Sequence, residues 1–200
     1  MSRLPNILTA IRIFIIPILI LTFYTPGLLA KVVGASLFAL AAITDYFDGY
    51  FARSLKAQSN FGKCLDPIAD KLIVIVAITL LIGFSNHDLW IVVPGLIIIC
   101  REVLVSGLRE FLAEFHVSIP VSKLAKYKTA VQMTSITILL LGEKGTSYTF
   151  QYLLGGVAEF GVKIFLVNLV VYIGKILFVI AALLTMMTGY AYLRAGMKKM

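Results

Sequence analysis

Long apolar runs separated by short polar stretches recur along most of the chain. Several approach the roughly 20 residues that a helix needs to cross the hydrocarbon core of a bilayer. We therefore predict an all-α polytopic membrane protein, a single domain over residues 1–200, with six transmembrane helices. The predicted spans are roughly 7–24, 32–53, 64–84, 89–111, 129–142 (starting nearer 121) and 168–193. Residues 143–167 are expected to form a loop with a short surface or re-entrant helix.

The composition supports this interpretation. Hydrophobic residues make up 60% of the chain and charged residues 14%, against ~45–50% and ~25% in soluble domains. A soluble enzyme and a disordered protein are therefore both disfavoured. The net charge of +8 suits lipid headgroups and membrane topology better than nucleic acid.

The basic residues indicate an orientation. With a cytoplasmic N-terminus, twelve Lys and Arg residues fall on the cytoplasmic side and four on the other. This positive-inside bias predicts that both termini are cytoplasmic. We expect a multi-pass protein of the cell's inner (cytoplasmic) membrane.

Four aspartates lie in or beside the second and third predicted spans. Asp45 and Asp48 are three residues apart, and Asp66 and Asp70 are four apart, so each pair faces one way on a helix. The connection between the spans is short, which predicts antiparallel neighbours with both pairs a turn or two inside the cytoplasmic surface. Four carboxylates cannot share a low-dielectric site as four anions without cations or protons.

An all-oxygen set without His or Cys suits a hard ion such as Mg²⁺ or Mn²⁺. Two such ions would balance four carboxylates, and two-metal sites typically serve phosphoryl chemistry. The alternatives are helix packing through small residues with local salt bridges, or the ion site of a divalent-cation transporter. Transporter sites tend to lie near the bilayer midplane, often between repeated halves, and this chain shows no repeat.

These residues carry a resemblance to a known family. The string Asp45-x2-Asp48-Gly49-x2-Ala52-Arg53-x8-Gly62-x3-Asp66-x3-Asp70 resembles the complete signature of the CDP-alcohol phosphatidyltransferases. Other stretches resemble its glycerol-3-phosphate-dependent members: Leu4-Pro5-Asn6-Ile7-Leu8-Thr9-x2-Arg12, Arg101-Glu102-x6-Arg109-Glu110 and Lys126-x-Lys128-Thr129-x2-Gln132. Ala125 stands where glycine would be expected.

The resemblance implies six transmembrane helices, a homodimer, and transfer of a phosphatidyl group from CDP-diacylglycerol to glycerol 3-phosphate, with CMP released. It implies that two divalent cations, Mg²⁺ or Mn²⁺, are held by Asp45, Asp48, Asp66 and Asp70. Asp70 would also be the general base. The cytidine diphosphate would be bordered by Gly49, Ala52, Arg53 and Gly62.

A phosphorylated acceptor needs cations. Arg101 and Arg109 are eight residues apart and share a helix face, and an arginine fork fits phosphate. With Lys126 and Lys128 they are the predicted acceptor-phosphate site. Alternatively, the lysines reflect the positive-inside bias and Arg101 pairs with Glu102. Arg12 could contribute to the site or simply snorkel. The residues leave open other acceptors: inositol phosphate, serine or phosphatidylglycerol.

Overall fold

The computed structural model describes residues 4–55, 60–115, 123–142 and 160–197. Within these ranges, the side chains of residues 4–9, 28, 45–55, 60–67, 113–114, 123 and 160–167 are not described. The described residues form six helices, and none of them lies in a strand. The helices are α1 (Leu4–Tyr24), α2 (Leu28–Leu55), α3 (Asn60–Phe84), α4 (Leu89–Glu114), α5 (Lys123–Gly142) and α7 (Phe160–Met197).

Each helix lies where an apolar run predicts one, although several boundaries differ. α2 and α3 both begin four residues earlier than predicted, and α5 begins at Lys123, close to the earlier start that we expected. The prediction of a loop over residues 143–167 is wrong for 160–167, which form the first turns of α7. The sequence Phe160–Val167 is apolar apart from Lys163, so the helix continues through it. Residues 143–159 lie outside the described residues.

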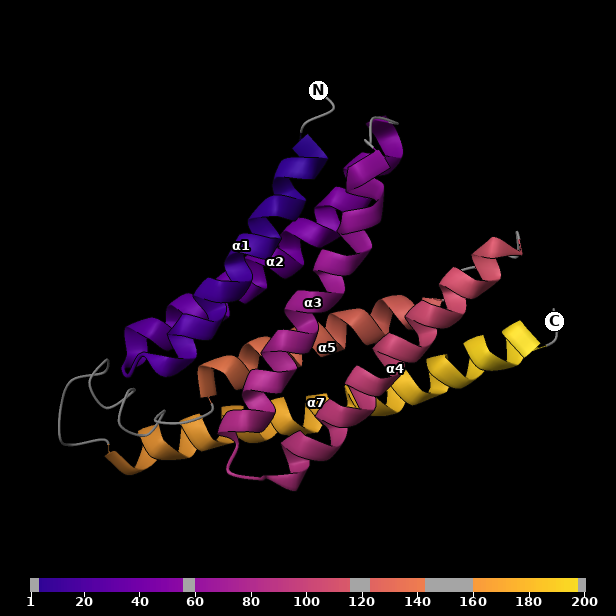
Figure 1. Ribbon diagram of the computed structural model, residues 1–200. Helices are drawn as coiled ribbons and strands as arrows, with labels where there is room; N and C mark the ends of the chain where they lie inside the picture. The colour runs from indigo at the N-terminus through magenta and orange to yellow at the C-terminus, as the bar shows by residue number, and fades with distance from the viewer. Residues whose placement is uncertain (1–3, 56–59, 116–122, 143–159, 198–200) are drawn as a thin grey trace.

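The helices pack as two groups of three (Figure 1). α1 packs against α2 and α3, while α7 packs against α4 and α5. Contacts of α2 with α5 and of α3 with α4 join the groups. The core between them contains large buried side chains from all six of these helices: Leu19, Phe38, Ile78, Leu81, Ile98, Leu139 and Phe178. Burial of such side chains contributes roughly 1.5–3 kcal/mol each where the alternative is exposure to water.

Glycines permit close approach at two of these contacts. A Cβ added to Gly95 of α4 would lie 2.9 Å from Ile78 Cγ2 of α3. One added to Gly174 of α7 would lie 2.8 Å from Ile138 Cγ2 of α5. Small residues at helix interfaces are typical of packing inside membranes.

A tight turn joins α3 to α4. Asn86 and His87 have positive φ angles of 51° and 62°. Asp88 Oδ1 accepts a hydrogen bond from the Trp90 backbone N–H at 2.9 Å. Its other oxygen, Oδ2, forms an ion pair with Lys175 Nζ of α7 at 2.5 Å. Burial raises the pKa of the Asp88 carboxyl, but the Lys175 and Trp90 contacts outweigh it and hold that pKa below its usual value. The turn thereby links the end of α3 and the start of α4 to the interior of α7.

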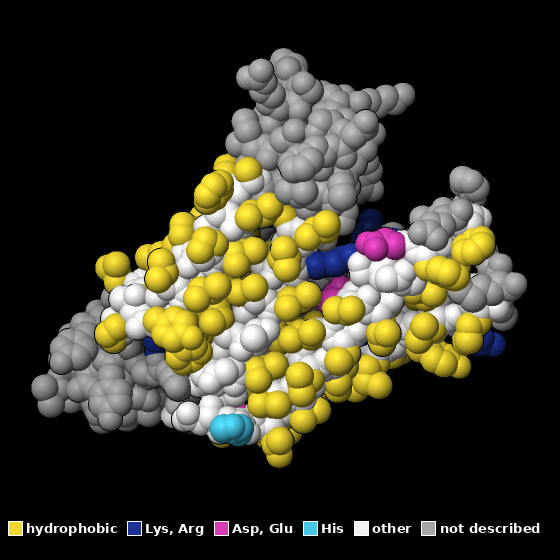
Figure 2. Space-filling model, in the orientation of Figure 1, with side chains coloured by type: hydrophobic (Ala, Val, Ile, Leu, Met, Phe, Trp, Pro, Cys, Tyr) yellow, Lys and Arg dark blue, Asp and Glu magenta, His cyan; other side chains and the backbone are white. Residues whose placement is uncertain are grey.

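The outer surface is apolar. Large exposed side chains on several helices include Phe14, Leu29, Leu104, Tyr172 and Met187, and Figure 2 shows hydrophobic side chains over most of one face. Within the described residues, Leu89–Leu112 and Asn168–Met197 are long and apolar enough to cross a membrane, and Ala10–Tyr24 and Leu29–Thr44 are shorter apolar helices. The fold therefore fits a membrane protein.

Candidate active site

The four predicted metal-binding aspartates lie on helical backbone. Asp45 and Asp48 are on α2, and Asp66 and Asp70 are on α3. α2 ends and α3 begins at the same end of the molecule (Figure 1), with four residues between them. The helical spacing therefore puts each pair on one helix face, as predicted.

Most of this predicted site lies outside the described side chains. The seven positions concerned are Asp45, Asp48, Gly49, Ala52, Arg53, Gly62 and Asp66. Their proposed contacts with metal and cytidine diphosphate stay predictions. Asp70 is the member of the signature whose side chain the structure describes.

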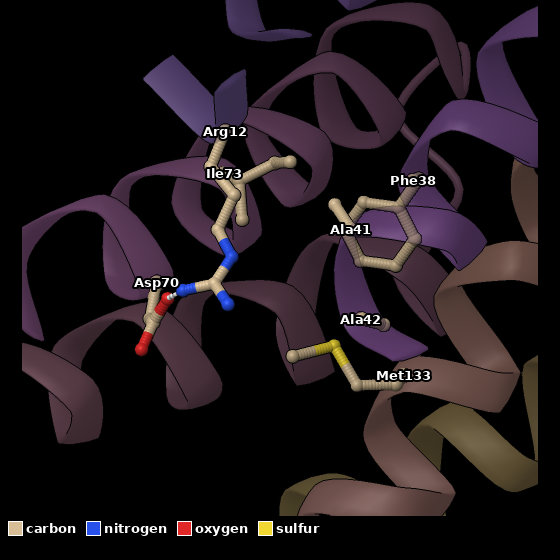
Figure 3. Close-up of a pocket in the computed structure, with 7 residues that line it drawn as sticks. All are labelled: Arg12, Phe38, Ala41, Ala42, Asp70, Ile73 and Met133. Atoms are coloured by element: carbon tan, nitrogen blue, oxygen red, sulfur yellow. Dashed lines mark hydrogen bonds and ion pairs between the residues drawn. The ribbon is translucent and has the colours of Figure 1, made fainter. Parts of the chain in front are cut away.

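Asp70 forms an ion pair with Arg12 (Figure 3). The guanidinium reaches from α1 to the carboxylate on α3, and the Arg12 side chain is only 4% exposed, against 31% for Asp70. Arg12 therefore does not snorkel to the surface. An arginine within an apolar helix indicates an interior role, so the sequence already favoured a contribution to the site over snorkelling for Arg12.

The pair lies at one end of a small cavity. Its remaining walls are mainly apolar: Phe38, Ala41 and Ala42 of α2, Ile73 of α3, and Met133 of α5 (Figure 3). The cavity has room for about one water molecule. Apolar walls strengthen electrostatic interactions at its polar end, because little solvent is present to screen them.

The donor chemistry fits a hard divalent cation. No group of three potential ligands occurs among the described residues, but three of the four aspartates fall outside that set. All four offer carboxylate oxygens, the ligands that Mg²⁺ and Mn²⁺ prefer. Asp70 is also paired with the guanidinium of Arg12, so its carboxylate already has one positive counter-charge.

A second charged cluster joins α4 to α5. Lys128 of α5 donates to Glu102 of α4, and both side chains are largely buried. Arg101 lies 3.7 Å from the other oxygen of Glu102. Of the two alternatives considered from sequence, the structure thus shows the local ion pair for Arg101, and the ammonium of Lys128 is already neutralised. Lys126 is exposed and is not part of this cluster of described side chains.

Arg101 and Arg109 converge on α7. Their guanidinium carbons lie 5.9 Å and 5.6 Å from the centre of the Tyr192 ring. The predicted common face of the two arginines is therefore confirmed. Arg101 also donates to Thr188 Oγ1 at 3.1 Å. Thr188 and Tyr192 were not among the residues predicted from sequence, although their i, i+4 spacing in an apolar helix was a usable signal.

Lys71 links α3, which carries Asp70, to α4, which carries Arg101 and Arg109. It follows Asp70 on α3 and donates a hydrogen bond to Ser106 of α4, which lies between Arg101 and Arg109 in the sequence. Figure 2 shows Lys, Arg and acidic side chains gathered in a hollow between α3 and α4, within an otherwise apolar face. The Lys71–Ser106 contact therefore joins the helix that carries Asp70 to the helix that carries Arg101 and Arg109.

The sequence profile of the CDP-alcohol phosphatidyltransferase family matches residues 2–193. The chain belongs to this family. Among its relatives, a protein of Rickettsia bellii is 48% identical over 98% of this chain and 97% of its own length. One from Rickettsia felis is 46% identical over the same shares. One from Pseudomonas fluorescens is 44% identical over 76% of this chain and 78% of its own. All three are named CDP-diacylglycerol–glycerol-3-phosphate 3-phosphatidyltransferase.

Membership explains why the signature residues occur together. In this chain α2 and α3 carry the signature, and Asp70 is its last residue, where α3 meets α1. Family membership also removes the divalent-cation transporter from consideration as the primary activity.

Proposed function

We propose that this protein transfers the phosphatidyl group of CDP-diacylglycerol to glycerol 3-phosphate. The structural observation that carries the proposal is the Lys71–Ser106 contact, which joins α3, the helix of Asp70, to α4, the helix of Arg101 and Arg109. A base and a phosphate-binding pair are what an acceptor alcohol with its own phosphate requires. The shared name of the nearly full-length relatives supports the same acceptor.

The signature aspartates bind the donor side. Asp45, Asp48, Asp66 and Asp70 would hold two divalent cations, Mg²⁺ or Mn²⁺. When bound, such ions offset the negative charge of a pyrophosphate. Gly49, Ala52, Arg53 and Gly62 border the cytidine diphosphate.

Asp70 acts as the general base. It accepts the proton of a glycerol 3-phosphate hydroxyl, and that oxygen forms a bond to the phosphorus that carries diacylglycerol. The bond from this phosphorus to the bridging oxygen breaks, and CMP leaves with that oxygen. Arg12 holds the Asp70 carboxylate beside the cavity during proton transfer.

Arg101 and Arg109 bind the acceptor phosphate. Two guanidiniums held over one ring repel each other, and a phosphate dianion between them offsets that repulsion. Lys128 contributes less directly than its sequence position suggests, because its ammonium is bound to Glu102. Lys126 supplies an exposed positive charge near the site.

The protein works in the inner membrane with its active site facing the cytoplasm. The apolar exposed helices suit a bilayer, from which CDP-diacylglycerol would enter sideways with its acyl chains left in lipid. CMP and glycerol 3-phosphate are water-soluble, which suits a site near the cytoplasmic surface. We propose a homodimer on the strength of the family resemblance.

An acceptor panel tests the assignment. Purified protein would receive labelled CDP-diacylglycerol and either Mg²⁺ or Mn²⁺, with glycerol 3-phosphate, serine, inositol phosphate or phosphatidylglycerol as acceptor. We expect phosphatidylglycerol phosphate and CMP in equal amounts with glycerol 3-phosphate alone. Turnover with another alcohol and none with glycerol 3-phosphate would move the protein to a different branch of its family.

A further inference from the structure

We propose that α7 forms the seat of the acceptor-phosphate site and that Tyr192 is a positioning residue for both Arg101 and Arg109. The inference rests on the proposed function, since the phosphate concerned is that of the acceptor. It assigns a role to a helix that carries none of the residues of the family signature.

One face of α7 is built for this contact. Thr188, Gly189 and Tyr192 are all buried, and their spacing puts them on one side of the helix. Their neighbours Met187 and Tyr190 are more than 60% exposed and point to the apolar surroundings. A buried polar face on an apolar helix requires a polar partner, because an unpaired polar group in such surroundings is unfavourable.

Arg101 occupies that face through three contacts. Its guanidinium donates to Thr188 Oγ1 at 3.1 Å. The Thr188 hydroxyl in turn donates to the Leu184 carbonyl at 2.8 Å, which leaves an oxygen lone pair for the arginine. A Cβ at position 189 would lie 3.0 Å from Arg101 Cγ, so glycine makes room for the arginine stem. The Tyr192 ring is the third contact, so the seat consists of Thr188, Gly189 and Tyr192.

Arg109 reaches the same ring from two turns further along α4. Eight residues correspond to about 12 Å along a helix axis, yet both guanidinium carbons lie within 6 Å of the Tyr192 centroid. The ring attracts each cation and thereby holds both guanidiniums near Tyr192 before any anion arrives. Two guanidinium forks fixed in this way can meet one phosphate without first being ordered.

This arrangement predicts a specific kinetic effect. The role proposed for the ring is to set the positions of the two arginines, with no part in binding the donor or the reacting hydroxyl. Its loss should therefore raise KM for glycerol 3-phosphate, while kcat and the KM for CDP-diacylglycerol change little. General loss of folded protein would instead lower the amount of active enzyme without changing either KM.

Three tyrosine variants test the ring. Tyr192→Leu should raise KM for glycerol 3-phosphate roughly 3- to 30-fold, which is the scale of one or two cation–π contacts. Tyr192→Phe retains the ring and should stay within about threefold of wild type. Tyr190→Leu, on the exposed face of the same helix, should leave both KM values unchanged. An unchanged acceptor KM in Tyr192→Leu, or an equal rise in Tyr192→Phe, would overturn the proposal.

A second variant tests the seat independently of the ring. Gly189→Ala should displace the Arg101 stem by a few tenths of an ångström and raise the acceptor KM roughly 2- to 5-fold. Gly83→Ala is the matched control, because a Cβ there meets nothing within 4 Å. An acceptor KM for Gly189→Ala equal to that of Gly83→Ala would contradict the seat. Absence of turnover with glycerol 3-phosphate in the wild type would instead overturn the proposed function.

Discussion

Arg12 of α1 forms an ion pair with Asp70 of α3 across 58 residues of sequence. The pair joins the N-terminal helix to the last aspartate of the family signature. Because the arginine is buried and the carboxylate is partly exposed, Arg12 holds Asp70 from the interior side and leaves part of the carboxylate accessible. The arrangement gives the first helix a part in the site.

The first prediction is that Arg12→Gln lowers kcat. The variant removes the charge that holds the Asp70 carboxylate, so the base is poorly placed for proton transfer. We expect a fall of roughly 10- to 100-fold at saturating metal, below the ~10²–10⁴-fold attributed to a general base itself. Arg12→Lys should recover part of the activity. Ile11→Ala, at an exposed position of the same helix, is the control, and wild-type kcat in Arg12→Gln would refute the role.

The second prediction concerns the aspartates. Asp45→Asn, Asp48→Asn and Asp66→Asn each remove a charged oxygen ligand and should reduce both metal affinity and turnover. Asp70→Asn should lower kcat ~10²–10⁴-fold even at saturating metal. Asp88→Asn, in the turn at the other end of α3, should keep normal turnover. Metal titrations of each variant provide the measurement, and near-normal activity in any two of the first three would remove the two-metal proposal.

The helices were predictable from sequence because long apolar runs determine them. The helical period also correctly placed Arg101 and Arg109 on one face. The start of α7 was misplaced, because Gly161 and Lys163 suggested a loop whereas the apolar residues around them continue the helix.

The partners of the charged side chains were not predictable in the same way. Glu102 pairs with Lys128 across 26 residues, and Arg101 reaches Thr188 across 87. Periodicity gives the face of a residue on its own helix, but it does not say which other helix that face meets. The signature residues were therefore recognisable from sequence. The partners of Arg12, Thr188 and Tyr192 became known only from the packing of α1 and α7.

The third prediction concerns the buried pair of Glu102 and Lys128. Glu102→Gln leaves an uncompensated ammonium in a buried position, and loss of one partner from such a pair typically costs about 3–5 kcal/mol. The double variant Glu102→Gln/Lys128→Met removes both charges and should be much closer to wild type in stability. Thermal unfolding in detergent measures the coupling. Equal destabilisation by the single and double variants would mean that the pair is not coupled in this way.

The fourth prediction concerns orientation. Ser59 lies between α2 and α3, outside the described residues, and Thr25 lies in the exposed turn between α1 and α2. With Cys64 and Cys100 removed, Thr25→Cys should react with an impermeant thiol reagent from outside the cell, and Ser59→Cys only after permeabilisation. Labelling of both from outside would overturn the cytoplasmic placement of the active site.

The last prediction separates the acceptor from the donor. Arg109→Ala removes a proposed phosphate contact that exists in both the ground and the transition state, so its main effect should be a higher KM for glycerol 3-phosphate. A charged hydrogen bond of ~1.5–3 kcal/mol corresponds to a rise of roughly 10- to 150-fold. Arg109→Lys should recover part of this, since an ammonium keeps the charge but loses the planar fork. Arg194→Ala, on the exposed last turn of α7, serves as a control for loss of a surface cation and should leave the acceptor KM unchanged. A raised KM for CDP-diacylglycerol with an unchanged acceptor KM would place Arg109 at the donor, and the acceptor phosphate would then need a different partner.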